Sequence, residues 1–173
     1  MRSVKIFVIS ISIMMGFMAL VALLLPSKVT VSKSILINAT TTEVAREIQN
    51  FNSWKNWYPP FQNGNVTITT LQKTDSSFVM VTDERRRTLT MTMTRPRPEN
   101  IDILLSAGSK NDTTWQFIII PGRAQTQLTW NVNTTFSWYP WEKIKGIFLD
   151  KVTGRQYQEA LQSLKITVEK MHQ

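Results

Sequence analysis

The side chains that could transfer protons are few and scattered along this 173-residue chain. The only histidine, His172, is the penultimate residue, so no histidine-based triad or proton shuttle can form inside a folded domain. The other acid or base candidates lack a titratable partner at a telling spacing and are more simply explained as surface groups; they are Glu99, Asp102, Asp150 and Tyr157. The chain also lacks cysteine, which excludes a thiolate nucleophile and a zinc ribbon. The sequence therefore predicts no catalytic residue, metal or cofactor.

A second possible chemistry is the binding of anions by arginine. Arg85–Arg87 can converge with Arg95 and Arg97 across a hairpin, and such a group could hold phosphate, a lipid headgroup or a nucleic-acid backbone. We favour a solvated hairpin tip instead, because Asp83 and Glu84 flank the arginines. The chain has neither a recognition helix nor a stacking motif, so nucleic acid is not an expected partner.

The elements that must position any site begin with an uncharged apolar run of twenty residues, Ile6–Leu25. At about 1.5 Å per residue, a helix of this length spans roughly the 30 Å hydrocarbon core of a bilayer. A cleaved signal peptide and a buried core helix are the alternatives. The run is longer than the roughly 7 to 15 apolar residues of a signal peptide, and no small-residue cleavage site follows it. We therefore predict an uncleaved transmembrane anchor over residues 1–27.

The distribution of positive charge bears on the side of the membrane that the remaining residues occupy. Arg2, Lys5 and the terminal amine precede the apolar run, whereas Lys28 and Lys33 follow it. By the positive-inside rule, this small excess favours a cytoplasmic N-terminus. We expect a single-pass protein whose domain, residues 28–173, lies on the non-cytoplasmic side. That domain carries 18 basic and 12 acidic residues, which suits anionic partners but mainly favours solubility.

Residues 28–173 are enough for one domain with its own core. Apolar residues at every second position predict a first strand over residues 28–37. A short helix follows, with Thr40 or Thr41 as its cap. The pair Pro59–Pro60 then forbids helix continuation and predicts a loop.

Between Asn65 and Asn133, apolar residues recur with period two in six short runs, which predicts six further strands. The runs cover residues 66–71, 77–82, 88–95, 101–105, 115–120 and 126–133. In the clearest run, leucine or methionine alternates with threonine over Thr88–Thr94. One face of the sheet should therefore be dry and the other wet.

The last 33 residues return to helical spacing and carry two successive apolar stripes. Their members are Trp141, Ile144, Phe148 and Val152, then Tyr157, Leu161, Leu164 and Val168. Gly154 lies between the stripes and predicts a kink. The chain therefore predicts an α+β fold in which a curved antiparallel sheet of about seven strands wraps a long C-terminal helix. The space between them can be a packed core or a pocket.

Several short motifs occur in a characteristic order. The first strand ends in Ile35-Leu36-Ile37-Asn38-Ala39, Trp54-x-x-Trp57 and a proline follow the first helix, and the final helix carries Leu161-x-x-Leu164-Lys165 near Glu169. In this order, the segments between Val29 and Glu169 resemble the START-like (SRPBCC) superfamily, in its polyketide cyclase/dehydrase and lipid-transport branch. The resemblance implies a helix-grip fold with an apolar cavity between sheet and terminal helix. It does not imply catalysis.

Together, the anchor and the resemblance predict a membrane-tethered binding module that holds a hydrophobic or amphipathic, lipid-like molecule in this cavity. Only two residues separate the apolar run from the first strand, so the domain must stay close to lipid. The candidate lining residues are mostly aromatic or methionine, because such side chains adapt to variable apolar ligands. They are Trp54, Trp57, Met91, Met93, Trp115, Phe117, Trp130, Phe136, Phe148 and Leu149.

Simpler alternatives exist for these residues and for the function. Each lining residue could be ordinary core, and Trp54 with Trp57 could pin the first helix to the sheet. Trp138, Tyr139 and Trp141 could form an interfacial belt at the membrane.

Two other functions also stay open: a cyclase-type enzyme, which rests on the resemblance alone, and an envelope scaffold that contacts another protein. The predicted partners are an apolar small molecule and membrane lipid, and the sequence leaves the oligomeric state open.

Overall fold

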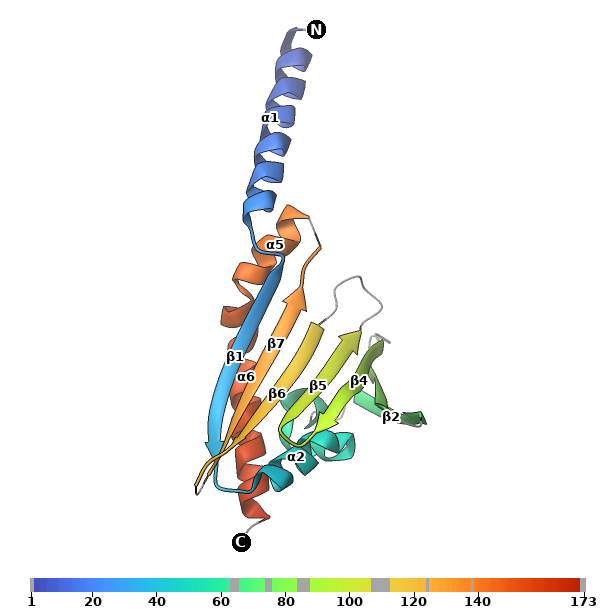
Figure 1. Cartoon of the computed structure of the whole chain (residues 1–173). Helices are drawn as coiled ribbons and strands as arrows, with labels where there is room; N and C mark the ends of the chain where they lie inside the picture. Colours follow the sequence, from blue (N-terminus) through green and yellow to red (C-terminus); the bar gives the residue numbers. More distant parts are fainter. Residues whose placement is uncertain are drawn as a thin grey trace.

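A computed structural model describes residues 2–62, 66–73, 76–83, 88–106, 113–123, 125–137 and 139–171. The chain begins with α1 (Arg2–Leu24), which projects away from the rest of the protein (Figure 1). In the part of the chain that the structure describes, α1 is the one helix long and apolar enough to cross a membrane. None of the residues in its most apolar stretch, Val4–Val21, is buried. A signal sequence near an N-terminus would have the same length and composition.

Seven antiparallel strands form one curved sheet in the order β1-β7-β6-β5-β4-β3-β2. Each predicted run lies inside an observed strand. The strands are β1 (Lys28–Ile37), β2 (Val66–Lys73), β3 (Ser76–Asp83), β4 (Thr88–Arg97), β5 (Asn100–Ser106), β6 (Thr113–Pro121) and β7 (Thr126–Thr135). The first strand pairs with the last, so both ends of the domain meet at one edge of the sheet.

The two faces of the sheet differ in polarity, as the alternating pattern predicts. On the outer face, the Ser32 hydroxyl of β1 donates to the side-chain oxygen of Asn131 on β7 at 2.7 Å. On the inner face, the neighbouring pair Val31 and Val132 is buried. The prediction of one dry and one wet face is confirmed.

Four short helical segments connect β1 to β2. They are α2 (Thr41–Gln49), the 3₁₀ turn η1 (Phe51–Ser53), α3 (Trp54–Trp57) and α4 (Pro59–Gln62). Thr40 caps α2, because its hydroxyl accepts from the Glu43 backbone N–H while the Glu43 carboxylate accepts from the Thr40 N–H. The predicted loop at Pro59–Pro60 is wrong, since these prolines begin α4. The first turn of a helix tolerates proline because its N–H groups have no partner inside the helix.

Two helices follow the sheet, α5 (Pro140–Ile147) and α6 (Leu149–Lys170). The helical path breaks at Phe148, and α6 continues as one helix through Gly154, so this glycine does not end the helix. A Cβ atom at Gly154 would lie 3.1 Å from Cε of Lys33 on β1. The glycine therefore lets α6 approach β1 and leaves room for the ion pair between Lys33 and Asp150, whose charged atoms are 2.9 Å apart.

Of the two predicted apolar stripes, one is buried and the other is exposed to solvent. The second stripe covers the inner face of the sheet, and its members Leu161, Leu164 and Val168 are buried. The first stripe faces outward: Trp141 is 55% exposed and Phe148 is 52% exposed. The chain turns between the two helices, so a stripe that is continuous in sequence is split between the core and the surface. The helix-grip fold as a whole is confirmed.

We expect the replacement of Leu164 by alanine to lower the free energy of unfolding by about 2–5 kcal/mol, because it leaves a cavity between α6 and the sheet. Ile166→Ala is the matched control on the same helix, since Ile166 is 48% exposed. That control should change stability by less than about 0.5 kcal/mol. Denaturant unfolding of the full chain in mild detergent, followed by tryptophan fluorescence, measures both values. Equal losses in the two variants would contradict the placement of α6.

Candidate functional site

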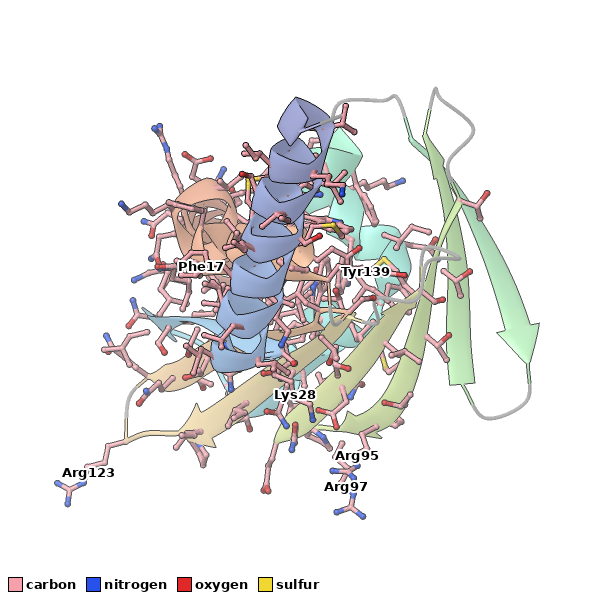
Figure 2. All side chains as sticks on the ribbon, turned by 90° about the horizontal axis from the view of Figure 1, so that it is seen from above. Phe17, Lys28, Arg95, Arg97, Arg123 and Tyr139 are labelled. Atoms are coloured by element: carbon pink, nitrogen blue, oxygen red, sulfur yellow. The ribbon has the colours of Figure 1, made fainter. Side chains whose placement is uncertain are left out.

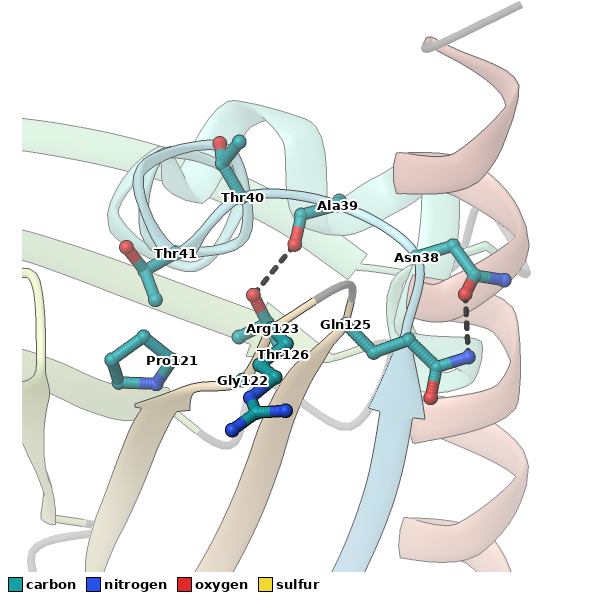
Figure 3. A pocket seen from close by; sticks show the side chains of 9 residues that line it. All are labelled: Asn38, Ala39, Thr40, Thr41, Pro121, Gly122, Arg123, Gln125 and Thr126. Carbon is teal, nitrogen blue, oxygen red and sulfur yellow. Dashed lines mark hydrogen bonds between the residues drawn. The ribbon is translucent and has the colours of Figure 1, made fainter.

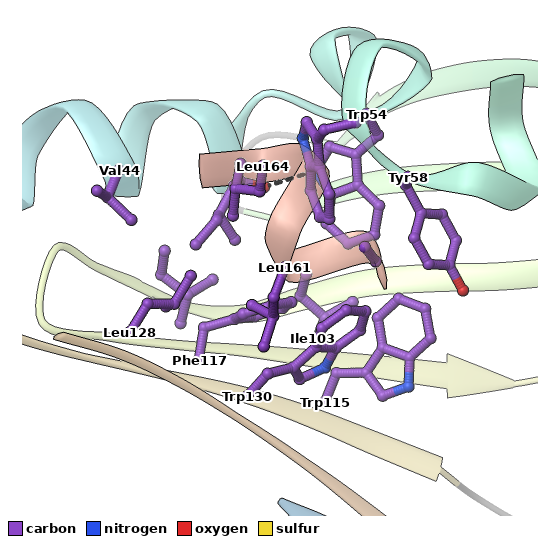
Figure 4. Close-up of a cluster of buried hydrophobic side chains, with 14 of the residues drawn as sticks. Val44, Trp54, Tyr58, Ile103, Trp115, Phe117, Leu128, Trp130, Leu161 and Leu164 are labelled. Carbon is purple, nitrogen blue, oxygen red and sulfur yellow. Dashed lines mark hydrogen bonds between the residues drawn. The ribbon is translucent and has the colours of Figure 1, made fainter. Parts of the chain in front are cut away.

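Aromatic rings gather between the inner face of the sheet, α3 and α6 (Figure 4). The ring of Trp54 lies parallel to that of Trp115 with 5.8 Å between centroids, and Phe117 stacks on Trp130 at 4.9 Å. Tyr157 of α6 closes the group, with its ring centroid 4.9 Å from that of Trp130. We call this group the aromatic cluster; its members are Phe51, Trp54, Trp57, Tyr58, Phe61, Trp115, Phe117, Trp130 and Tyr157.

The secondary structure explains why these rings meet. Trp115 and Phe117 are two residues apart on β6 and therefore share a face, and Phe117 is the direct cross-strand neighbour of Trp130. Trp54 and Trp57 are three residues apart on α3, which places both rings on one side of that helix. The Trp54 indole N–H donates to the Ile48 carbonyl of α2 at 2.8 Å and so joins α3 to α2.

Three other indole groups of the cluster have no hydrogen-bond acceptor. The Nε1 atoms of Trp57, Trp115 and Trp130 are buried, and no atom in the described part of the protein accepts from them. Native proteins rarely leave such donors unpaired, because each one costs about 1–3 kcal/mol. In the described part of the protein, these three donors are open to an acceptor atom such as the oxygen of water or of a ligand. The cluster is an apolar box with hydrogen-bond donors inside it.

Two tyrosine hydroxyls belong to the same cluster. Burial raises the pKa of Tyr58, and the proximity of Tyr157 raises it further. Burial also raises the pKa of Tyr157, although a hydrogen bond with the Thr153 side chain partly opposes this shift. Both hydroxyls are therefore protonated at neutral pH and act as hydrogen-bonding groups, not as bases.

The structure brings most of the predicted lining residues together. Five of them belong to the aromatic cluster and are at most 3% exposed: Trp54, Trp57, Trp115, Phe117 and Trp130. Met91 and Met93 are buried on β4 in the same hydrophobic core. Leu149 is partly buried and packs against this core from the start of α6.

Two predicted lining residues lie elsewhere. Phe136 follows β7 and is half-buried, with its ring against Gly146 of α5. Phe148 is at the junction of α5 and α6 and points to the surface. The sequence pattern missed Tyr58 as a member of the cluster, although it directly follows Trp57 in an aromatic run. Tyr157 was expected both as an acid or base candidate and as a member of the second apolar stripe, but not as a lining residue, and the structure places it on that stripe of α6 against Trp130.

The charged candidates lie outside the aromatic cluster. Asp102 points to the outer face of β5, where its carboxylate is 3.7 Å from the Arg95 guanidinium, and Asp150 pairs with Lys33. Arg95 and Arg97 extend from the sheet into solvent (Figure 2). Glu99 is exposed, while His172 and Arg85–Arg87 fall outside the described residues. Within the described ranges, no three histidine, aspartate or glutamate side chains are grouped as a metal site would require.

A surface hollow of about 370 Å³ lies where the β6–β7 turn meets the segment after β1 (Figure 3). Its polar groups bond to one another: the Gln125 amide donates to the Asn38 side chain at 2.7 Å, and the Thr126 hydroxyl donates to the Ala39 carbonyl at 2.6 Å. This hollow is at the end of the domain opposite α1. The hollow is open to solvent and mixes polar with apolar lining groups, so it gives an apolar ligand little enclosure.

Comparison with known proteins assigns this chain to a family. The profile of the family described as "Polyketide cyclase / dehydrase and lipid transport" matches residues 28–169. This match covers most of the chain, and the protein therefore belongs to the polyketide cyclase/dehydrase and lipid transport family, in the START-like superfamily. The predicted family membership is confirmed. A search of curated proteins finds no match.

Solved structures share the fold at low sequence identity. A START superfamily protein from Mycobacterium smegmatis has a TM-score of 0.64 at 16% identity, over 83% of this chain and 99% of that one. The ZhuI aromatase/cyclase from a Streptomyces species has a TM-score of 0.64 at 14% identity, over 84% and 96%. The di-domain aromatase/cyclase StfQ of steffimycin biosynthesis has a TM-score of 0.65 at 12% identity. The alignment covers 84% of this chain but only 52% of StfQ, and these likenesses show the fold alone.

The buried tyrosines predict a loss of stability in alkali. The unfolded chain releases these protons near pH 10, whereas the folded protein holds them to higher pH. The contribution of the protonated hydroxyls is therefore fully present below pH 10 and is lost as the pH rises above it, by up to about 1.4 kcal/mol per pH unit for each tyrosine. Tyr58→Phe should keep the ring packing and flatten this loss. Denaturant unfolding at a series of alkaline pH values, with tyrosinate absorbance as a second signal, measures the free energy of unfolding against pH. If this free energy falls as steeply with pH in Tyr58→Phe as in the wild type, the burial of the Tyr58 hydroxyl is refuted.

Proposed function

We propose that this protein is a membrane-tethered binding module for a hydrophobic or amphipathic, lipid-like molecule. In this proposal, residues 1–27 are the anchor, and residues 28–173 hold the ligand between the sheet and α6. The START-like fold of the polyketide cyclase/dehydrase family is a ligand-binding or cyclase-like module, which supports the general class. The observation that carries the proposal is the set of three buried indole N–H groups without a protein acceptor, on Trp57, Trp115 and Trp130.

The chemistry of the aromatic cluster favours an amphipathic ligand. Its rings offer apolar surface, and each Å² of ligand surface removed from water contributes about 25 cal/mol. Its unpaired groups are all donors, so the matching part of the ligand carries acceptor oxygens such as those of a carboxylate, ester or ketone. A pure hydrocarbon would leave these donors unsatisfied. A fatty acid, a lipid ester or a polyketide-like molecule would satisfy them.

The edge of the core supplies a route for such a ligand. Leu89, Leu149 and Tyr157 are only partly buried and pack against the core from β4 and α6. Behind them lie Met91 and Met93, whose unbranched side chains can change rotamer at low cost. Movement of these side chains would admit an acyl chain beside the aromatic rings without unfolding the sheet.

The junction between α1 and β1 supports a tether that keeps the domain at the membrane. Only Leu25, Pro26 and Ser27 separate α1 from β1. The Phe136 N–H donates to the Ser27 carbonyl at 2.8 Å, which ties this junction to the end of β7. The domain therefore stays within a short distance of the lipid that α1 would cross. The slight excess of positive charge before the apolar run, from Arg2 and Lys5 at the start of α1, supports a position on the non-cytoplasmic side.

A cyclase-like enzyme is the second candidate function. The observation that favours it is the pair of protonated tyrosine hydroxyls, Tyr58 and Tyr157, beside the unpaired indole donors. Such donors could bind and polarise the carbonyl oxygens of a bound substrate. Binding requires the same groups, so catalysis would be an addition to the binding function.

Removal of one unpaired donor should weaken ligand binding without a matching loss of stability. In Trp130→Phe, the aromatic packing is largely retained but the indole N–H is lost. We expect oleate, which supplies acceptor oxygens, to bind about tenfold more weakly, the equivalent of one hydrogen bond of about 1.4 kcal/mol. Native mass spectrometry of the full chain released from detergent measures the fraction that carries copurified lipid or added oleate.

Trp141→Phe is the matched control, because Trp141 lies on α5 outside the aromatic cluster. It should leave the liganded fraction unchanged. A wild-type protein that carries no lipid and takes up no oleate would contradict the binding proposal. Equal binding by wild type and Trp130→Phe would show that the unpaired indole does not contact the ligand.

The tether predicts that the intact chain stays in membranes. After alkaline carbonate extraction of membranes from cells that express the full chain, we expect the protein in the pellet with an intact mass of 20.0 kDa. Protein recovered in the soluble fraction, with a mass that begins near residue 28, would identify α1 as a cleaved signal sequence and reject the anchor.

A further inference from the structure

The polarity of α5 is reversed relative to an ordinary surface helix. Such a helix turns its apolar stripe to the core and its charged residues to solvent. The inward residues of α5 are proline, lysine and glycine; these buried positions are Pro140, Lys143 and Gly146. The outward residues are large and apolar; Trp141, Ile144 and Ile147 are 37–55% exposed.

Contacts on the inner side hold α5 in this orientation. The Lys143 side chain is 7% exposed, and its Nζ donates to the Leu25 carbonyl at the end of α1 at 3.0 Å. A cation suits this position, since the carbonyl end of a helix carries partial negative charge. On the same side, a Cβ atom at Gly146 would lie 2.8 Å from the Phe136 ring. A larger residue there would press on this ring, so the glycine suits the close packing of α5 against Phe136.

Helix α5 lies next to the point where α1 leaves the domain (Figure 1). Tyr139, just before α5, stacks on Trp141 with ring centroids 5.1 Å apart and an interplanar angle of 16°. Lys28 and Lys145 are exposed at the same end of the domain. In the view from above, Tyr139 and Lys28 both lie on the same side of α1 (Figure 2).

We propose that the outer side of α5 is a second membrane-contact surface, seated in the headgroup region of the bilayer that α1 crosses. We call it the α5 surface; its residues are Tyr139, Trp141, Ile144, Ile147 and Phe148. This inference rests on the proposed tether. It adds the bilayer as the partner of the α5 surface, whose apolar side chains are exposed in the structure. The occupant is lipid because the surface is continuous with the apolar helix α1. Paired tyrosine and tryptophan with flanking lysines is also the composition of membrane–water interfaces.

Attachment through both α1 and the α5 surface would restrict the orientation of the domain on the membrane. A single helix would let the domain rotate and tilt about the short junction. Contact through the α5 surface fixes the tilt, so that the strands run away from the membrane and the C-terminal end of α6 lies far from it, as the arrangement in Figure 1 implies. The partly exposed rim of the core near Leu149 then lies on the membrane-facing half of the domain, where a ligand could pass between bilayer and core.

Single-cysteine labelling tests the proposal directly, because the natural chain has no cysteine. The full chain is reconstituted in phosphatidylcholine–phosphatidylglycerol vesicles with an NBD fluorophore at one position. Ile147→Cys and Trp141→Cys report on the α5 surface. Phe17→Cys reports on α1, and Gln162→Cys is a matched exposed helical position on α6 away from α5.

We expect the probes at positions 147 and 141 to be several-fold brighter than the probe at 162 and to be quenched by shallow doxyl lipids. The probe at 17 should be quenched by deep doxyl lipids, and the probe at 162 only by aqueous iodide. Quenching at 147 and 141 by iodide, with 17 still in the hydrocarbon, would overturn this inference and leave the tether intact. Iodide quenching at 17 as well would reject the tether itself. Protection of 147 and 141 from both quenchers would show that protein covers the α5 surface, which also overturns the inference.

Discussion

The fold depends on the burial of one apolar sheet face beneath α6 and the short helices α2 and α3. A sheet with one dry face must cover it, and α6 is the long helix that does so, through fully buried residues such as Leu161 and Leu164. Gly154 lets this helix approach β1, and the ion pair of Lys33 with Asp150 lies beside that contact. The place where α6 crosses the sheet determines which inner-face side chains are enclosed. It therefore determines where the aromatic cluster lies.

The aromatic cluster combines good ring packing with poor hydrogen bonding. Stacked and edge-on contacts at centroid distances of 4.8–6.4 Å hold the rings in place. Trp54 satisfies its indole through a carbonyl of α2, whereas Trp57, Trp115 and Trp130 find no acceptor in the described part of the protein. A core selected for stability alone would replace these indoles with phenyl or aliphatic groups. Their retention is the kind of local violation expected where a site serves a ligand.

The end of the domain next to α1 follows a different rule from the core. There, Lys143 and Gly146 lie inside while Trp141 and Ile147 lie outside, because the inner positions must meet the end of α1 and the ring of Phe136. Helix α1 is itself apolar on all sides. Both features fit an environment that is apolar outside the protein. The same physical reasoning thus accounts for the anchor and for the orientation of α5.

The strands and the family could be predicted from the residues alone. Period-two runs located every strand of the sheet, the alternation placed Trp115 and Phe117 on one face, and the order of motifs indicated the helix-grip fold. The tertiary structure was needed to show that α6 continues through Gly154, that the stripe containing Trp141 is exposed, and which indoles lack an acceptor in the described part of the protein. Periodicity shows which residues share a face of their own element. What covers that face depends on the path of the whole chain, because packing partners come from segments far apart in sequence.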